Sequence, residues 1–390
     1  MSQSARPPFH VWIPELFRTK GGIQAYSTYF LQALQQTVPD AEIDVFLKHD
    51  CTIAPSMLQR SAIANSENLR FYCAGSYPSS VRTPMFAAQL LGCGLQQRPK
   101  LVIATHLNFT TAAHQLWRLA KVPYWTVAHG IEAWDITRPS LRSALRDADR
   151  ILAVSHYTRD RLLKNLDLDP QKVVVLPNTF DADRFNIAAK PMHLLQRYGL
   201  KADQPIVLTV CRLSTQEQYK GYDQVLNALP LIRQAIPNVH YLLVGKGDDR
   251  PRIEQRIVDL NLQDAVTLTG FVPDAELCDY YNLCDVFAMP SKGEGFGIVY
   301  LEALACGKPT VGGNQDGAID ALCQGRFGAL IDPDRSDKLA ETIIQILQQS
   351  YPNPLLYSPQ LLREQLIKVY GFQSFQSRLQ QILRPVFQPQ

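Results

Sequence analysis

Residues 290–302 combine a glycine-rich turn, two carboxylates and the start of an apolar helical run. Glycines let the backbone approach a ligand closely, and the free N–H groups and dipole of a helix start favour an anion such as phosphate. The ionised carboxylates of Glu294 and Glu302 can accept hydrogen bonds from sugar hydroxyls on either side of that phosphate. The pattern therefore predicts a binding site for a ligand that carries both phosphate and hydroxyl groups.

The spacing of the two carboxylates argues for binding rather than for hydrolysis. Eight helical steps would separate Glu294 from Glu302 by about 12 Å, whereas carboxylates that hydrolyse a glycosidic bond stand about 5 to 9.5 Å apart. The alternative is a helix cap, because Ser291 and Glu294 have the Ser-x-x-Glu pattern of a capping box. Capping alone explains neither the glycines around Phe296 nor Glu302.

The elements that must position this stretch alternate between strands and helices. Such alternation predicts parallel sheets flanked by helices, and the pattern restarts near residue 205, so the expected fold is α/β with two doubly wound domains. Residues 176–181 are the expected linker, because Pro and Asn interrupt the preceding strand. The expected strands are 9–13, 43–48, 69–73, 101–105, 124–128, 150–154 and 173–176, then 205–210, 239–244, 266–269, 285–289 and 308–311.

Ligands of doubly wound sheets bind at the carboxyl ends of the strands, so the residues after each strand are candidate ligand contacts. A Lys20-Gly21-Gly22 turn follows the first strand, and His129 follows the fifth. Arg212 follows the first strand of the second half, and Lys220 lies at the next helix start. Two cations near a helix N-terminus would neutralise a diphosphate, Arg212 with its planar fork and Lys220 as a point charge. Taken singly, such a lysine or glycine pair is more often an ordinary surface residue or turn.

Length and composition indicate an ordinary globular protein. The 390 residues exceed one compact core, and 46% are hydrophobic while 19% are charged. The eight cysteines contain no Cys-x-x-Cys pair, which favours reduced thiols and a cytoplasmic location. We find no signal peptide in residues 1–9 and no run of 18 apolar residues, so we expect a soluble or peripheral protein.

Arginines recur at every fourth position between residues 138 and 150, which would line one face of a helix. One interpretation is a solvated face balanced by Asp147 and Asp149; the other is a patch that contacts anionic lipid of the inner membrane or a phosphate-bearing acceptor. Aromatic residues are not interleaved with basic ones, so nucleic acid is not an expected partner. The arginines are Arg138, Arg142, Arg146 and Arg150.

Over nearly its whole length the chain resembles the retaining nucleotide-sugar glycosyltransferases of family 4, whose fold is called GT-B. The resemblance rests on the Glu-x7-Glu pattern within Pro-Ser-x-x-Glu-Gly-Phe-Gly at 290–302, on residues 303–309, and on the linker from 176 to 185. It implies two Rossmann-like domains that face each other across a cleft: an acceptor-binding domain, 1–180, and a donor-binding domain, 181–371. The final helix, 372–390, would return to the N-terminal domain.

The resemblance also implies a role for each matching residue. His129 and Glu294 would be catalytic, with Glu294 on the donor sugar and His129 near that sugar and the β-phosphate. Glu302 would hold the ribose, and Arg212 with Lys220 the diphosphate. The remaining donor-binding residues are Gly22, which would close over the diphosphate, Phe271 and Val272 near the base, and Gly295, Phe296, Gly297, Ile298 and Val299 at the phosphates.

Some residues depart from the family pattern. Cys211 stands where the family usually has glycine, the loop from Arg212 to Lys220 is longer than usual, and Asp316 follows Gly312-Gly313 where the family usually has Glu. The Asp-x-Asp pairs lie in helical, loop or linker contexts, so we expect no metal and no other cofactor. The resemblance implies front-face substitution with retention, in which a donor phosphate oxygen helps to deprotonate the acceptor hydroxyl.

The predicted function is transfer of a hexose, glucose from UDP-glucose, to a saccharide or lipid-linked acceptor in cell-surface or exopolysaccharide synthesis. A GDP-mannose-dependent mannosyltransferase is the chief alternative, because the motifs contact phosphate and ribose, which all such donors share. A non-catalytic sugar-nucleotide-binding protein is a further alternative. A dinucleotide-dependent dehydrogenase is disfavoured, because Gly245-Lys246-Gly247 lacks the third glycine of Gly-x-Gly-x-x-Gly.

Overall fold

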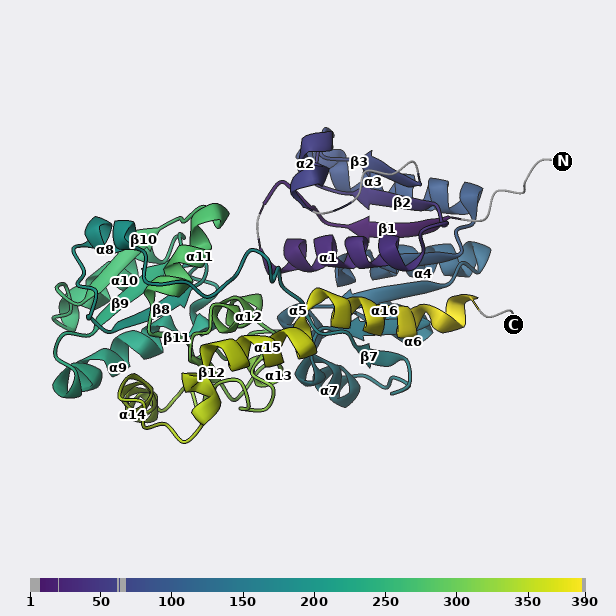
Figure 1. The fold of residues 1–390 in the computed structure, drawn as a ribbon. Coiled ribbons are helices and arrows are strands. Elements are labelled where there is room, and N and C mark those ends of the chain that lie inside the picture. Colours follow the sequence, from purple (N-terminus) through teal and green to yellow (C-terminus); the bar gives the residue numbers. More distant parts are fainter. Residues whose placement is uncertain (1–7, 20, 62, 64–67, 388–390) are drawn as a thin grey trace. The chain divides into compact units, whose positions relative to one another are not determined.

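The computed structural model describes residues 8–19, 21–61, 63 and 68–387, and Lys20 of the predicted glycine turn lies outside this part. The chain divides into two compact units (Figure 1). The N-unit comprises Met1–Thr179 with Phe372–Gln390, and the C-unit comprises Phe180–Gly371. The division falls within the predicted linker.

The N-unit is built on a parallel sheet. Within the described residues seven strands pair in the order β3-β2-β1-β4-β5-β6-β7, so the chain starts in the middle of the sheet and extends it in both directions. The strands are nearly continuous apolar runs, as expected for strands covered on both faces. Their bounds are β1 Phe9–Ile13, β2 Ile43–Leu47, β3 Leu69–Cys73, β4 Leu101–Ala104, β5 Tyr124–Ala128, β6 Arg150–Ala153 and β7 Val173–Val175.

Helices cover both faces of this sheet. Helix α1 lies on one face, and α3 and α6 both pack against α4 on the other (Figure 1). The last helix, α16 (Phe372–Phe387), packs beside α1, where the Phe375 and Tyr26 ring centroids lie 5.9 Å apart. The other bounds are α1 Gly22–Thr37, α2 Pro55–Arg60, α3 Ser79–Gln97, η1 Leu107–Phe109, α4 Thr110–Ala120, α5 Ile131–Trp134, α6 Pro139–Asp147 and α7 His156–Asn165.

The C-unit repeats the architecture with six described strands in the order β10-β9-β8-β11-β12-β13. The strands are β8 Ile206–Val210, β9 His240–Val244, β10 Val266–Gly270, β11 Val286–Met289, β12 Thr310–Gly313 and β13 Ala329–Ile331. The helices are α8 Met192–Tyr198, η2 Gln218–Lys220, α9 Tyr222–Ala235, α10 Arg250–Asp259, α11 Asp274–Leu283, α12 Ile298–Ala305, α13 Ala318–Ala321, α14 Ser336–Leu347, η3 Pro354–Tyr357 and α15 Pro359–Tyr370. Strand β13 was absent from the prediction.

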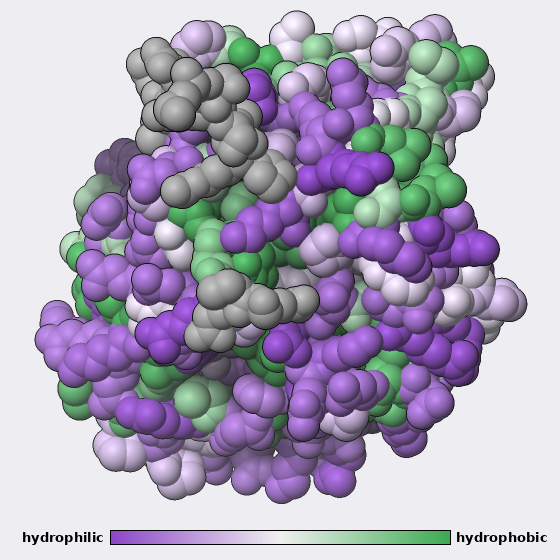
Figure 2. Space-filling view, turned by 90° about the vertical axis from the view of Figure 1, so that its right-hand side faces the viewer, coloured by the Kyte–Doolittle hydropathy of each residue, from purple (hydrophilic) through white to green (hydrophobic). Residues whose placement is uncertain are grey.

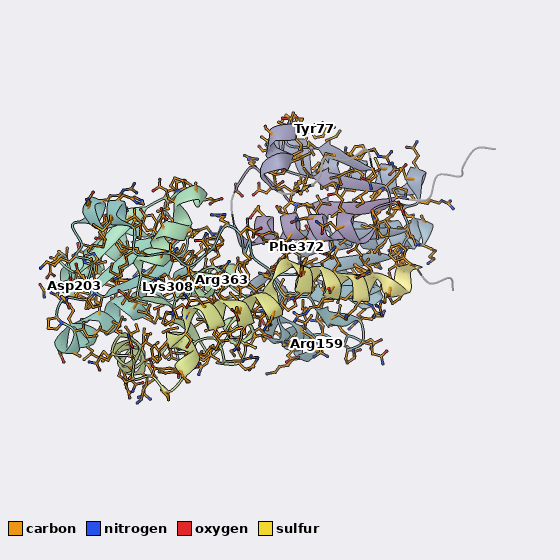
Figure 3. The ribbon with its side chains drawn as sticks, in the orientation of Figure 1. Tyr77, Arg159, Asp203, Lys308, Arg363 and Phe372 are labelled. Carbon is orange, nitrogen blue, oxygen red and sulfur yellow. The ribbon has the colours of Figure 1, made fainter. Side chains whose placement is uncertain are left out.

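One side chain of α15 connects the start of the C-unit to the end of α12. The guanidinium of Arg363, labelled in Figure 3, donates to the carbonyl oxygens of Ala305 at 2.6 Å and Ala182 at 2.5 Å, and also to that of Phe185. Three charge-assisted hydrogen bonds from one planar fork hold the chain after the linker against the end of α12.

The predicted arginine face differs from the structure. Helix α6 ends at Asp147, and Arg150 opens β6, where its guanidinium donates to the Gln171 carbonyl. The two acids hydrogen-bond to other groups: Asp147 accepts from His114 at 2.8 Å, and Asp149 accepts from the backbone N–H of Tyr124 at 2.9 Å. The prediction that four arginines line one helix is therefore wrong: only Arg142 and Arg146 lie within α6, while Arg138 is its N-cap and Arg150 belongs to β6.

Hydrophilic residues dominate the face shown in Figure 2, with hydrophobic residues in small groups between them. Within the described part of the chain, no helix combines the length and the apolar character needed to cross a bilayer.

Candidate functional site

The loops that follow β8 and β11 meet at the carboxyl edge of the C-unit sheet. Gly221, at the start of α9, has φ +87°, and a Cβ atom there would lie 2.4 Å from the Pro290 carbonyl oxygen. The backbone N–H of Lys292 donates to the Tyr219 carbonyl at 2.9 Å. Only glycine allows this approach without strain, and the approach brings Lys220 to the glycine-rich turn.

Lys220 and Glu294 form an ion pair between Nζ and Oε1. Only 16% and 12% of their side-chain surfaces are exposed. Burial is the largest single effect and lowers the pKa of Lys220, but the charge and hydrogen bond of Glu294, together with smaller contributions from Tyr219 and Cys211, raise it above its ordinary value. The two residues predicted to contact the diphosphate and the donor sugar are therefore in direct contact.

Asp316 holds the turn around Glu294 through hydrogen bonds to its carboxylate. Its carboxylate accepts from the backbone N–H groups of Glu294 at 2.7 Å and Ala318 at 2.9 Å, and from the Ser291 hydroxyl. Asp316 is fully buried, and burial raises the pKa of its carboxyl to about 7. Sequence reasoning left this residue without a role, although the Gly312-Gly313 pattern before it was the available signal.

The glycine-rich turn is not a capping box. Helix α12 begins at Ile298, with Gly297 as its N-cap and no side-chain hydrogen bond to the cap, and Ser291 instead donates to Asp316. Gly295 and Phe296 lie in the turn between Glu294 and this helix start. The N-terminal end of α12, with Ile298 and Val299 in its first turn and no acidic residue there, is an anion-binding arrangement.

Glu302 lies four residues after Ile298 in α12 and takes no part in the ion pair of Lys220 and Glu294. Its Oε2 accepts from the Tyr281 hydroxyl at 2.7 Å. Burial raises the pKa of the Glu302 carboxyl to about 7, against smaller opposing effects of the Tyr281 hydrogen bond and the Arg184 charge. Tyr281 was not among the predicted site residues, because 21 residues separate it from Glu302.

Arg212 is the most exposed of the predicted phosphate ligands, with 74% of its side-chain surface accessible. Its guanidinium pairs with Glu217, a residue that sequence reasoning missed. The backbone around Arg212 packs directly on the loop after β9: a Cβ atom at Gly245 or Gly247 would lie 1.8 Å from the carbonyl oxygen of Cys211 or Leu213. Close backbone packing thus accounts for the Gly-Lys-Gly sequence.

Phe271 and Val272 follow β10, where the base was predicted to bind. The Phe271 side chain is 57% exposed, and the Lys246 ammonium lies 5.0 Å from its ring centroid. An exposed aromatic face beside a cation is suited to stacking on a planar base.

His129 follows β5 in the N-unit and is held by three contacts. Its Nε2 donates to the Thr105 carbonyl at 2.7 Å, and its backbone N–H donates to Glu132 Oε1 at 2.6 Å. Its ring meets the Tyr26 ring edge-on at 5.0 Å. Burial lowers the pKa of His129 to about 4, so the neutral ring carries a free acceptor at Nδ1 at neutral pH.

A second histidine, His106, lies close to His129 in the N-unit. The ring of His106, which sequence reasoning missed, has its centroid 6.1 Å from that of His129. Burial first, and the neighbouring His129 second, lower the pKa of His106 to about 4.

Gly22, also in the N-unit, is the first residue of α1 and is exposed. A Cβ atom built on Gly22 would have no other atom within 4 Å, so ligand atoms could approach its backbone.

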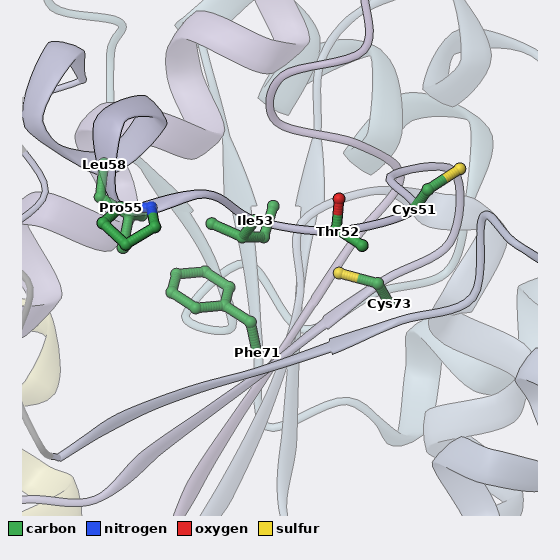
Figure 4. A pocket seen from close by; sticks show the side chains of 7 residues that line it. All are labelled: Cys51, Thr52, Ile53, Pro55, Leu58, Phe71 and Cys73. Atoms are coloured by element: carbon green, nitrogen blue, oxygen red, sulfur yellow. The ribbon is translucent and has the colours of Figure 1, made fainter.

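A surface pocket of about 460 Å³ opens elsewhere on the N-unit, between the loop after β2, helix α2 and strand β3 (Figure 4). None of the predicted site residues lines it. Its lining residues are Cys51, Thr52, Ile53, Pro55, Leu58, Phe71 and Cys73. Among the described residues, no group of three or more His, Cys, Asp or Glu side chains is arranged to hold a metal ion.

Comparisons with known proteins agree with this architecture. The sequence profile described as "Glycosyltransferase Family 4" matches residues 20–184, and that described as "Glycosyl transferases group 1" matches residues 194–365. The GDP-mannose-dependent alpha-(1-6)-phosphatidylinositol monomannoside mannosyltransferase of Mycolicibacterium smegmatis is 35% identical over 56% of this chain and 59% of its own length. The Mycobacterium tuberculosis H37Rv protein of that name is 29% identical over 84% of this chain and 86% of its own length.

Solved structures show the same fold. Anabaena HepE, in complex with UDP and glucose, superimposes with a TM-score of 0.76 at 21% identity, over 97% of this chain and 100% of that chain. Sucrose-phosphate synthase from Thermosynechococcus elongatus superimposes with a TM-score of 0.78 at 21% identity, over 98% and 99% of the two chains.

Two doubly wound units, each built on a parallel sheet, define the GT-B fold. The two family profiles together span most of the sequence. The chain belongs to glycosyltransferase family 4.

Proposed function

We propose that this glycosyltransferase moves a hexose from a nucleoside diphosphate sugar to a hydroxyl of a saccharide or lipid-linked acceptor, with retention of anomeric configuration. The observation that carries the proposal is the buried pair of Lys220 and Glu294. It joins a group that neutralises phosphate to a group that accepts hydrogen bonds from a sugar, at the carboxyl edge of a doubly wound sheet.

The chemistry is stabilisation of a departing diphosphate. The bond from the anomeric carbon to the β-phosphate oxygen breaks, the acceptor oxygen bonds to the same face of that carbon, and the acceptor proton passes to a phosphate oxygen. Lys220, Arg212 and the start of α12 supply positive charge where negative charge develops. Neutral His129 offers Nδ1 as an acceptor for a sugar hydroxyl. These groups require no metal.

Two sugar nucleotides are candidate donors. UDP-glucose is the donor predicted from the sequence, for synthesis of a cell-surface or exopolysaccharide. GDP-mannose is the second candidate, because two relatives are named as GDP-mannose-dependent enzymes. Phe271 and Lys246 do not discriminate between uracil and guanine, since either base can stack on an exposed ring.

Incubation of the purified protein with a panel of sugar nucleotides, followed by assay of nucleoside diphosphate release, tests the proposal. Turnover should require Glu294: Glu294→Gln should lower kcat strongly while Asp337→Asn, at an exposed ion pair with Arg335, leaves it unchanged. Anomeric NMR of the product should show the configuration of the donor. A protein that binds sugar nucleotides yet turns over none with any acceptor would be the non-catalytic binder instead.

A face of the N-unit supports a lipid-linked acceptor. Helices α3 and α4 contain no acidic residue, and the one acid of α6, Asp147, pairs with His114. We propose that this face contacts an anionic membrane surface. It exposes Val81, Met85, Leu95 and Leu119 beside the basic residues Arg118, Lys121, Arg138 and Arg146.

Sedimentation with vesicles tests the membrane contact. The protein should pellet with phosphatidylglycerol vesicles at low salt, less with phosphatidylcholine vesicles, and less after the double change Arg138→Glu and Arg146→Glu. A double change of Arg335→Glu and Arg233→Glu on the C-unit is the charge-matched control. Equal binding of both charge variants would refute this face as the contact.

A further inference from the structure

Two cysteines lie side by side in the C-unit, next to the predicted ribose contact. Cys278 is in α11 and Cys306 is the C-cap of α12, and their Sγ atoms are 3.9 Å apart. All eight cysteines are free thiols. Because a disulfide bond is about 2.0 Å long, closing this pair needs the sulfurs to approach by roughly 2 Å.

The two thiols are chemically unequal. Cys306 is buried and hydrogen-bonds to the Cys278 sulfur, which also accepts from the Asn282 side-chain amide at 3.4 Å. The hydrogen bond from Cys306 is the main cause that lowers the pKa of Cys278 to about 6 and raises that of Cys306. A partly accessible cysteine with a lowered pKa therefore lies beside a buried cysteine with a raised pKa, which is the arrangement of an oxidisable pair.

The pair is connected to Glu302 through both helices. Tyr281, whose hydroxyl holds Glu302 at 2.7 Å, lies three residues after Cys278 on α11. Cys306 lies four residues after Glu302, and its backbone N–H donates to the Glu302 carbonyl oxygen at 3.2 Å. Drawing the sulfurs together moves α11 against α12 at the place where this hydrogen bond is made.

We propose that Cys278 and Cys306 form a peroxide-sensitive dithiol that closes to a disulfide and weakens sugar-nucleotide binding at Glu302. The Cys278 thiolate attacks a peroxide oxygen, so that an S–O bond forms, the O–O bond breaks and the leaving oxygen takes a proton. The Cys306 sulfur then attacks the sulfenic sulfur; the S–S bond forms, the S–O bond breaks, and the Cys306 proton leaves in water. Two thiols are oxidised and one peroxide is reduced.

Formation of the disulfide does not depend on the proposed function, whereas its effect on sugar-nucleotide binding rests on that function. The expected loss of affinity is about 3- to 10-fold, the net effect of one perturbed hydrogen bond. The loss should be reversed by dithiothreitol.

Peptide mapping after hydrogen peroxide treatment tests the bond itself. Trypsin cuts at Lys292, between the two cysteines, so a disulfide appears as a linked peptide pair. The linked pair should form in the wild type and in Cys51→Ser, a control at an exposed cysteine, but not in Cys278→Ser or Cys306→Ala. A folded, peroxide-treated wild type without the 278–306 link would overturn the dithiol.

Titration with UDP-glucose and, in parallel, GDP-mannose tests the consequence. Oxidised wild type should bind the preferred donor about 3- to 10-fold more weakly than reduced wild type, and Cys278→Ser should show no response to peroxide. Equal affinity of reduced and cross-linked protein would overturn the regulatory part. Reduced protein that binds neither sugar nucleotide would instead count against the proposed function, while the peptide map still decides the dithiol.

Discussion

Sugar-nucleotide binding should become tighter as pH rises from 6 to 8, because Glu302 must give up a proton to receive ribose hydroxyls. Burial raises the pKa of this carboxyl to about 7 in the free protein. Only the ionised form accepts hydrogen bonds with both oxygens, so binding is linked to proton release.

The size of the effect follows from the titration. With a pKa of about 7, roughly one Glu302 in eleven is ionised at pH 6 and ten in eleven at pH 8, so the affinity should rise about tenfold, or about 1.4 kcal/mol. The intact sugar nucleotide is the right ligand, because its doubly esterified diphosphate does not titrate in this range while a free nucleoside diphosphate does.

Isothermal titration at pH 6, 7 and 8, in buffers of different ionisation heat, measures both affinity and proton release. Glu302→Gln should bind more weakly at pH 8 and show a flat profile. A wild-type affinity that does not change with pH would refute the reasoning. A slope that survives in Glu302→Gln would also refute it and would point to Asp316, whose carboxyl has a pKa of about 7 as well.

Three further changes have expected outcomes. Asp316→Ala leaves two buried backbone N–H groups without their acceptor and should lower the free energy of unfolding by about 2–4 kcal/mol in urea titrations. Asp337→Ala, at an exposed ion pair, should leave the free energy of unfolding nearly unchanged. Gly221→Ala should cost about 2–4 kcal/mol, because of its φ of +87° and the Pro290 carbonyl, while Gly92→Ala, in open space within α3, should gain about 0.5–1 kcal/mol; equal thermal shifts would contradict this. His129 has a folded pKa of about 4, below its unfolded value of 6.5, so its unfolded form binds more protons and stability is lost as pH falls from 6.5 towards 4, by up to about 3 kcal/mol. The buried carboxyls with raised pKa values act in the opposite direction over this window, so the difference in unfolding free energy between wild type and His129→Gln is the quantity to measure, and a pH-independent difference would contradict the assignment.

Local patterns in the sequence predicted most of the fold. Strands β1, β3 and β5 have the predicted bounds, because a buried apolar run is a local signal. Strand β13 was missed because Ala-Leu-Ile contains a single β-branched residue, whereas the equally short strand β7 consists of three valines. The arginine face was overestimated because the four-residue spacing of the arginines continues into β6, whose start at Arg150 was itself predicted.

The site was predicted where residue types carry their own chemistry and was missed where contacts join distant segments. Glu294 and Lys220 stood out by type, but 74 residues separate them, so their ion pair could not be read from spacing. Asp316 and Tyr281 act by holding Glu294 and Glu302 from other elements. Such supporting contacts depend on tertiary packing, which no local pattern encodes.

The glycine contacts between the C-unit loops have a consequence for protein engineering. A Cβ atom at Gly221, Gly245, Gly247, Gly313 or Gly317 would lie 1.8 to 2.4 Å from a carbonyl oxygen of another loop. Each loop is therefore shaped by the backbone of its neighbour, and a single loop grafted from a relative would meet a surface made for a different one. Exchanging donor preference by chimera should succeed only when the loops after β8, β9, β11 and β12 are transplanted as one set.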